Sequence, residues 1–280
     1  MALKLMYITN QPEVALIAEK YGVDRIWVDL ETLGKNERQK NMDTVKSKHT
    51  VEDIRILKPI LKKAELLVRI NPWNCNSREE IDNVIRAGAD LIMLPMWKTA
   101  DEVKSFIGTV GGRKKTVLLL ETKEAVECID EVLQISGIDE IHIGLNDLHL
   151  SYGMTFMFEP LADGTVEGLC KRFREAGLPY GFGGIAKIGT GMLPAEKIIM
   201  EHYRLGSTRA ILSRAFCDTR IIESVEEIEK VFALNMEKLR SYEKYISQMG
   251  MEAYLENKEE VIRCVADISK KMKEDMECQK

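Results

Sequence analysis

The sequence lacks the short signatures that would place it in a class at once. Its six cysteines form no C-x-x-C pair, so neither a zinc site nor a disulfide framework is indicated, and we expect buried free thiols. No apolar run approaches the roughly eighteen residues of a membrane-spanning helix. The first residues, MALKLMYITNQPEVA, have none of the zones of a signal peptide. We therefore expect a cytoplasmic protein with no membrane partner.

Positive charge is also in short supply. The 40 Lys and Arg residues are outnumbered by 45 Asp and Glu residues, which gives a formal net charge of −5, and they are spread along the chain. Such a chain offers no basic field to a phosphate backbone, so we expect no nucleic-acid partner. The turn TNQPEV after the first apolar run lacks the glycines of a dinucleotide-binding fingerprint.

Eight short apolar runs are present instead, and helix-period segments separate most of them. The runs are KLMYIT, DRIWVDLE, AELLVRIN, DLIMLPM, KTVLLLET, DEIHIGLND, PYGFGGIA and TRAILSRAF. The segments with helical periodicity are 12–21, 51–63, 77–87, 99–107, 123–135 and 194–205. Continuously apolar strands that alternate with helices predict a parallel sheet covered on its faces, and eight such units predict a (β/α)8 TIM barrel. An open doubly wound sheet is the alternative fold.

Two long, charged amphipathic stretches, 225–249 and 253–278, follow the eighth run and are separated by Gly250. We therefore divide the chain into a barrel, 1–222, and a C-terminal helical extension, 223–280. One of the two helices is expected to cover the barrel and the other to pack on a neighbouring subunit, which predicts a homo-oligomer. Their mixed-sign charge is typical of a solvated helix face.

Polar side chains close five of the eight runs. In a (β/α)8 barrel the carboxyl ends of the strands form the active face, so these side chains are expected to meet there. They are Asp29 and Glu31 after the second run, Arg69 and Asn71 after the third, Glu121 after the fifth, Asn146 and Asp147 after the sixth, and Ser213 and Arg214 after the eighth.

Two of these carboxylates, Glu121 and Asp147, end adjacent runs and predict a metal site. A carboxylate at the end of an apolar strand is unfavourable unless something there needs its charge. Two carboxylate oxygens with water in the remaining positions suit Mg²⁺ or Mn²⁺. Two structural explanations stay open for Glu121, namely an acid favoured at a helix start and an ion pair with Arg69.

The ordered motifs of the first half of the chain resemble those of the HpcH/HpaI aldolase and citrate lyase family. WVDLE resembles the acid motif of the family's second strand, LVRIN its arginine strand, and AGADLIMLPMWKTADEV its fourth strand and following helix. LLLET resembles the strand with the metal-binding Glu, and IGLNDL the strand with the metal-binding Asp. The resemblance runs from Tyr7 to Gly153 and implies a metal-dependent enzyme on a (β/α)8 barrel.

The activity that the resemblance implies is that of a carbon–carbon lyase of the class II aldolase type. It would act on a 2-oxo acid through a pyruvate-like enolate. Glu121 and Asp147 would bind the divalent metal, Mg²⁺ or Mn²⁺, and Arg69 would bind the carboxylate or enolate oxygen of the substrate. A guanidinium suits that oxygen as a second electrophile.

The other strand-end residues are given supporting roles. Asp29 and Glu31 are expected to organise the metal's water ligands from the second shell. The second substrate is expected to be an aldehyde or an anionic, sugar-like acceptor. Asn146, Ser213 and Arg214 complete the predicted substrate-binding set.

The proton shuttle departs from the family pattern. Aldolases of the family carry a His directly after the D-x-E acids, whereas this chain has Thr32. In the insertion LGKNERQKNMDTVKSKHTVEDI that follows, His49 opens the next helix and is the leading candidate for the base, and Arg38 and Gln39 are candidates for a polar lid over an anionic substrate. His149, or a hydroxide on the metal, are the alternatives.

Two further readings of the function stay open. The missing His permits a non-catalytic barrel that binds a 2-oxo acid, and the family resemblance also permits a citrate-lyase-like enzyme that acts on an acyl-CoA ester. The stretch YGFGGIAKIGTGMLPAE suggests a phosphate-holding loop around Lys187, although its glycines are equally explained by a tight loop over the barrel mouth.

Overall fold

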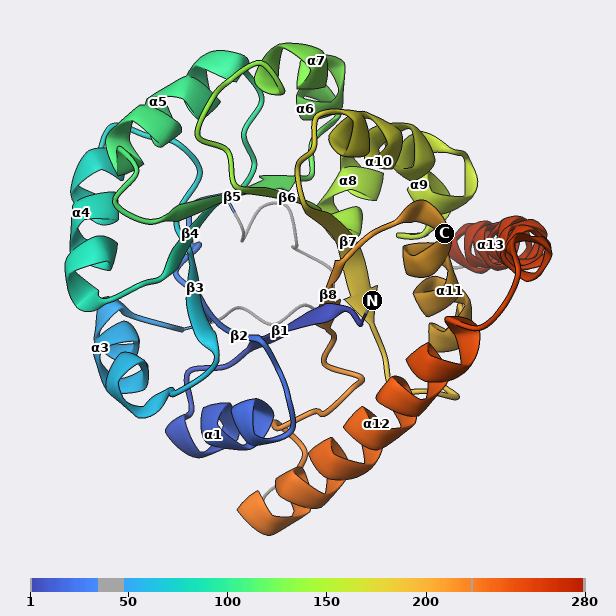
Figure 1. Ribbon diagram of the computed structural model, residues 1–280. Helices are drawn as coiled ribbons and strands as arrows, with labels where there is room; N and C mark the ends of the chain where they lie inside the picture. Colours follow the sequence, from blue (N-terminus) through green and yellow to red (C-terminus); the bar gives the residue numbers. More distant parts are fainter. Residues whose placement is uncertain (1, 35–47, 223, 279–280) are drawn as a thin grey trace.

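The computed structural model describes residues 2–34, 48–222 and 224–278, and all eight apolar runs form strands. The strands pair in parallel and in sequence order, and β1 pairs with β8, so the sheet closes into a barrel (Figure 1). The predicted (β/α)8 barrel is therefore confirmed. The strands are β1 (Lys4–Ile8), β2 (Arg25–Asp29), β3 (Glu65–Arg69), β4 (Leu91–Leu94), β5 (Lys115–Leu120), β6 (Glu140–Ile143), β7 (Tyr180–Ile185) and β8 (Arg209–Leu212).

Helices surround the barrel (Figure 1). They are α1 (Pro12–Lys20), α3 (Val51–Ile60), α4 (Ser77–Ala87), α5 (Ala100–Val110), α6 (Lys123–Glu127), α7 (Ile129–Val132), α8 (Leu145–Ser151), α9 (Glu159–Ala162), α10 (Thr165–Glu175), α11 (Ala195–Leu205), α12 (Val225–Ile246) and α13 (Met251–Cys278). The predicted helix 123–135 is broken into α6 and α7, and α8, α9 and α10 follow β6, where no helix range was specified. The sixth strand ends earlier than expected, at Ile143.

The core has two layers. Side chains that point out of the sheet pack against the surrounding helices, and side chains that point inward form a smaller cluster inside the barrel. Because successive side chains of a strand alternate between faces, β2 sends Arg25, Trp27 and Asp29 inward. The inner cluster consists of Met6, Trp27, Leu67, Leu91, Met93, Val117 and Leu119.

A buried ionic network closes the end of the barrel at which the strands begin. Arg25 donates to both carboxylate oxygens of Glu140, at 2.7 and 2.6 Å, and Arg209 donates to Glu140 from the other side, at 2.9 Å. Arg25 also pairs with Glu65. Burial alone would raise the pKa of Glu140, but the hydrogen bonds from the two arginines outweigh it and lower the pKa to about 2. The network keeps Glu140 ionised inside the fold.

The two C-terminal helices pack on the chain's own barrel. α12 lies against α1 and α11, and α13 lies against α11 and α9 (Figure 1). The Asn257 amide of α13 donates to the backbone oxygen of Lys197 and to the Glu201 carboxylate, both at 3.0 Å, and so fixes α13 on α11. Packing on a neighbouring subunit stays a prediction.

Two further expectations concern the cysteines and membranes. All six cysteines are free, and Cys170 and Cys217 are buried, but Cys75 and Cys278 are exposed, so the expectation of buried thiols was wrong for these two. Within the described ranges no helix is both long and apolar enough to cross a membrane.

Candidate active site

A cavity of ≈ 480 Å³ opens at the carboxyl ends of the strands, where the polar side chains were expected to meet. Glu31 does not line it, and Arg38 and Gln39 lie outside the described residues. The predicted site residues that do line the cavity are Asp29, His49, Arg69, Glu121, Asn146, Asp147, Ser213 and Arg214.

Arg69 is held from β2, the strand beside its own. Its Nε and Nη2 atoms donate to the two oxygens of Asp29, each at 2.9 Å, and Nη2 also lies 3.2 Å from Glu31. The guanidinium sits over the Trp27 ring, 5.1 Å from its centroid. Asp29 and Glu31 thus contact Arg69 directly; that they organise water on a metal stays a prediction.

This arrangement leaves one guanidinium nitrogen for a ligand. Nη1 of Arg69 makes no hydrogen bond within residues 2–34, 48–222 and 224–278, and Arg69 lines the cavity. Burial alone would lower the pKa of Arg69, but the charges of Asp29 and Glu31 outweigh it and raise the pKa above its ordinary value. The guanidinium therefore presents a fixed charge and two N–H donors to an anionic oxygen.

Glu121 follows β5 directly and is 3% exposed. Its Oε1 atom accepts the backbone N–H of Met96 at 3.1 Å. Met96 has a φ of 53°, and no other non-glycine residue in the described ranges has a positive φ. A side chain in the left-handed region is strained, and such strain clusters at functional sites. The strained turn after β4 thus aims an N–H at the Glu121 carboxylate.

The helix-start explanation for Glu121 is not supported. Thr122 is the N-cap of α6, and its hydroxyl accepts the N–H of Ala125 at 3.1 Å. Ion-pairing with Arg69 is not supported either, because the carboxylates that pair with Arg69 among the described residues are Asp29 and Glu31. The charge of Glu121 nevertheless helps to raise the pKa of Arg69, so the two side chains interact electrostatically, and both line the cavity.

Gly144 makes the room for this carboxylate. A Cβ atom on Gly144 would lie 2.6 Å from Oε2 of Glu121, which is closer than any real contact of this kind. Gly144 is also the N-cap of α8, so Asp147 lies in the first turn of that helix rather than at the end of β6 as predicted. The missing side chain leaves room for the Glu121 carboxylate in the cavity that Asp147 also lines.

The donor set fits a hard divalent cation. Glu121 and Asp147 supply carboxylate oxygens and no sulfur or imidazole nitrogen, which favours Mg²⁺ or Mn²⁺ over zinc. No group of three or more His, Cys, Asp or Glu side chains suited to a metal occurs in the part of the chain that the structure describes. A cation here would keep water in its other positions, as Mg²⁺ commonly does.

We expect Gly144→Ala to weaken metal binding, because the new methyl group must displace the Glu121 carboxylate. Displacing a group that orients a ligand typically lowers metal affinity by about 10- to 100-fold. Calorimetric titration with Mn²⁺ measures the effect. Gly168→Ala is the matched control, since a Cβ at Gly168 meets nothing within 4 Å. Equal Mn²⁺ affinity in the two variants would contradict the proposed cradle.

His49 is the histidine at the site. Of the four histidines, all within the described residues, it alone lines the cavity. Its Nδ1 atom accepts the backbone N–H of Asp29 at 3.0 Å, so the neutral ring carries its proton on Nε2. His149, the alternative, is 3% exposed, and its Nδ1 contacts the Leu145 backbone oxygen at 3.2 Å within α8. Thr32, at the position of the family's His, donates hydrogen bonds to the Asn71 side-chain oxygen from its backbone N–H and its hydroxyl.

Sequence reasoning missed part of the cavity wall. Trp27 lies beneath Arg69, and its inward direction was available from the alternation of Arg25, Trp27 and Asp29 along β2. Arg220, which pairs with Asp218 at 2.6 Å, also lines the cavity. Arg220 lies in the loop after β8. A loop has no strand or helix periodicity from which the direction of a side chain could be predicted.

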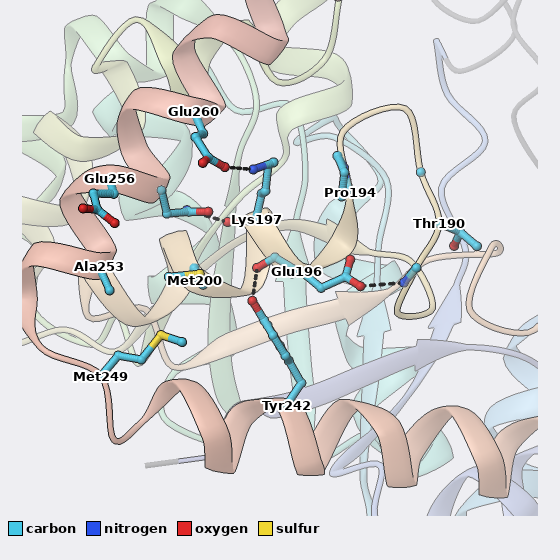
Figure 2. Close-up of a pocket in the computed structure, with 13 residues that line it drawn as sticks. Thr190, Pro194, Glu196, Lys197, Met200, Tyr242, Met249, Ala253, Glu256 and Glu260 are labelled. Carbon is cyan, nitrogen blue, oxygen red and sulfur yellow. Dashed lines mark hydrogen bonds and ion pairs between the residues drawn. The ribbon is translucent and has the colours of Figure 1, made fainter.

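The suggested phosphate loop belongs to a different cavity. Gly183 and Gly184 line the site, but Gly189, Thr190 and Gly191 line a separate cavity between α11, α12 and α13 (Figure 2). There the Glu196 carboxylate accepts the N–H of Gly189 at 2.8 Å and takes the place that an anion would occupy. Lys187 lines neither cavity. The tight-loop explanation of these glycines is the better one.

Comparison with known proteins places the chain in a family. The family model described as HpcH/HpaI aldolase/citrate lyase matches residues 4–158, so the chain belongs to that family. A search of curated protein sequences gave no match.

Solved structures share the fold. An HpcH/HpaI aldolase from Desulfitobacterium hafniense DCB-2 is 17% identical, with a TM-score of 0.60 over 76% of this chain and 86% of that one. An HpcH/HpaI aldolase/citrate lyase family protein from Burkholderia cenocepacia J2315 is 12% identical, with a TM-score of 0.58 over 76% and 88%. Citrate synthase SbnG is 16% identical, with a TM-score of 0.56 over 76% and 85%. The family and these neighbours support an enzyme.

Proposed function

We propose that the protein is a divalent-metal-dependent carbon–carbon lyase of the class II aldolase type, acting on a 2-oxo acid through a pyruvate-like enolate. The observation that carries the proposal is the meeting of Glu121, Asp147 and Arg69 in one cavity at the carboxyl ends of the strands. Its partners would be the 2-oxo acid and an aldehyde or anionic, sugar-like acceptor.

Each residue has a distinct task in this reaction. Glu121 and Asp147 would hold Mg²⁺ or Mn²⁺, which when bound supplies a Lewis acid for the keto and carboxylate oxygens of the substrate. Arg69, locked by Asp29, would direct Nη1 at the oxygen on which negative charge develops. Because the hydrogen bonds to Asp29 already hold the Arg69 guanidinium in place, it needs little reorientation as the negative charge develops.

His49 is the proposed proton-transfer residue. Its basic nitrogen, Nδ1, is engaged by the Asp29 N–H, so taking a proton from the substrate requires this hydrogen bond to open. A ring held against the strand that anchors Arg69 is well placed to move a proton beside the bound 2-oxo acid. The same contact ties the ring position to the Asp29–Arg69 pair.

We expect His49→Ala to lower kcat by about 10²-fold or more, the usual contribution of a positioned acid or base. Metal affinity should stay unchanged, because His49 is not a proposed ligand. Steady-state kinetics and Mn²⁺ titration separate the two effects. His149→Ala is the control variant and should keep its catalytic activity. Unchanged kinetics in His49→Ala would exclude His49 from the mechanism.

The decisive test follows the methyl protons of pyruvate. In D₂O, an enolate-forming enzyme exchanges these protons with solvent without needing an acceptor. We expect the ¹H NMR methyl signal to decay with metal-loaded protein and to persist after EDTA treatment. Persistence of the signal under both conditions would refute the pyruvate-enolate proposal.

A further inference from the structure

A hydrogen-bonded clamp holds the chain next to His49. The Asp53 carboxylate, in the first turn of α3, accepts the backbone N–H of Thr50 at 2.6 Å and the Thr50 hydroxyl at 3.1 Å through its Oδ2 atom. The other oxygen, Oδ1, accepts an N–H of the Asn10 side chain at 3.2 Å. We call Asn10, Thr50 and Asp53 the Asp53 clamp. It joins the loop after β1 to the residue that directly follows His49.

The clamp restrains the backbone of His49, whereas the ring is held separately. The Thr50 N–H belongs to the planar peptide group that links Thr50 to His49, so a hydrogen bond on that N–H also restrains the His49 backbone. The Nδ1 atom of the ring accepts the Asp29 N–H at 3.0 Å. A side chain on a fixed backbone moves by rotation between rotamers. Opening the bond to Asp29 would therefore turn the ring and leave its backbone in place.

Helix capping explains only part of this arrangement. A carboxylate at the third helical position commonly accepts the N–H of the N-cap residue. Glu102 does this at the start of α5, where it accepts the N–H groups of Lys98 and Thr99 at 2.6 and 3.1 Å. None of these three residues lines the active-site cavity. Asp53, by contrast, also bonds Asn10, which does line it, so the clamp joins a helix cap to the cavity wall.

We propose that Asp53 and Asn10 are positioning residues that hold the His49 ring at the cavity. The catalytic consequence rests on the proposed function of His49 in proton transfer. Asp53 does not line the cavity, so it acts through His49 rather than on the substrate. Displacing a reacting group by about 1 Å can lower a rate by about 10²-fold, so a residue that never touches the substrate can still set the rate.

Pyruvate methyl exchange in Asp53→Ala tests the catalytic consequence. We expect kcat to fall about tenfold or more, with the KM for pyruvate and the Kd for Mn²⁺ changed by less than about twofold, because the ring position alone is altered. The matched control, Glu102→Ala, removes the equivalent cap of α5 and should change kcat by less than about twofold. Equal kcat values in the two variants of an active enzyme would overturn the positioning role.

Exchanging the two polar side chains tests the clamp without a change of size. Asn10→Asp alone sets two carboxylates against each other, so we expect kcat to fall about tenfold or more. The double variant Asn10→Asp/Asp53→Asn restores an amide–carboxylate pair with donor and acceptor reversed, and its kcat should return to within about threefold of the wild type. A double variant no faster than Asn10→Asp would overturn the proposal.

Modification by diethyl pyrocarbonate reports on the ring without requiring turnover. His49 is half-buried, whereas the other three histidines are at most 3% exposed, so His49 is the one expected to react. Because the Asp29 N–H protects Nδ1, we expect the modification rate, followed by peptide mass spectrometry, to rise about threefold or more in Asp53→Ala and not in Glu102→Ala.

This measurement separates the clamp from the proposed function. If the wild type does not exchange pyruvate protons but modification of His49 still accelerates in Asp53→Ala, the pyruvate-enolate proposal fails and the positioning of the ring is supported. A modification rate in Asp53→Ala equal to that of the wild type would overturn the positioning role, whatever the activity.

Discussion

Glu121→Gln is expected to lose about 10³-fold or more in the rate of pyruvate methyl exchange at saturating Mn²⁺. The amide keeps the size of the side chain and can still accept the Met96 N–H through Oε1. It removes the charge, however, and with it one of the two carboxylates proposed to hold the cation. Exchange measured by ¹H NMR gives the rate, and a thermal melt shows whether the barrel stays folded.

Glu124→Gln provides the control. Glu124 lies three residues further on, on α6, and pairs at the surface with Lys98 at 3.2 Å. Its loss should leave exchange unchanged, since exposed ion pairs contribute little and Glu124 does not line the cavity. Wild-type exchange in Glu121→Gln would remove the metal-site proposal, whereas loss of exchange in both variants would indicate a general effect on the fold.

Glu140→Gln should destabilise the protein by about 3–5 kcal/mol, the usual cost of removing one partner of a buried ion pair. Arg25 and Arg209 would then face an amide that cannot neutralise them, at a position that is 6% exposed. In a chain of this size the loss corresponds to a fall in melting temperature of about 10 °C. Thermal and urea denaturation measure it.

The matched control is Glu52→Gln, which breaks the surface pair with Arg55, whose side chains are 63% and 55% exposed. Its expected effect is below about 1 kcal/mol. A Glu140→Gln protein as stable as this control would mean that the buried network contributes specificity of pairing rather than stability. The depressed pKa of Glu140 gives a second readout: the wild type should lose this contribution as the pH falls from the ordinary range of Glu towards about 2.

The barrel could be predicted because each parallel strand is buried on both faces and therefore reads as an uninterrupted apolar run. The same logic failed at β6, where Leu145 extends the apolar run although it belongs to α8. A short apolar segment does not distinguish a buried strand from a buried helix turn. Asp147 was consequently placed at a strand end although it lies on a helix.

Contacts across the barrel were beyond sequence reasoning. The pairing of Arg25 with Glu140 joins residues 115 positions apart. The hydrogen bond that the Met96 N–H donates to Glu121 depends on a strained φ at Met96, which cannot be read from the sequence. Which groups meet at one end of a barrel can be predicted, but how they bond there cannot.

The inward face of β2 has a consequence for redesigning the enzyme. Arg25 anchors the bottom of the barrel, Trp27 supports the guanidinium of Arg69, and Asp29 grips it while holding His49. One strand thus both stabilises the closed end of the barrel and positions Arg69 and His49 at the site, so its residues cannot be changed independently. A mutant library for new acceptors should therefore leave β2 intact and diversify Ser213 and its neighbours beyond β8, where a change of shape leaves the anchored half in place.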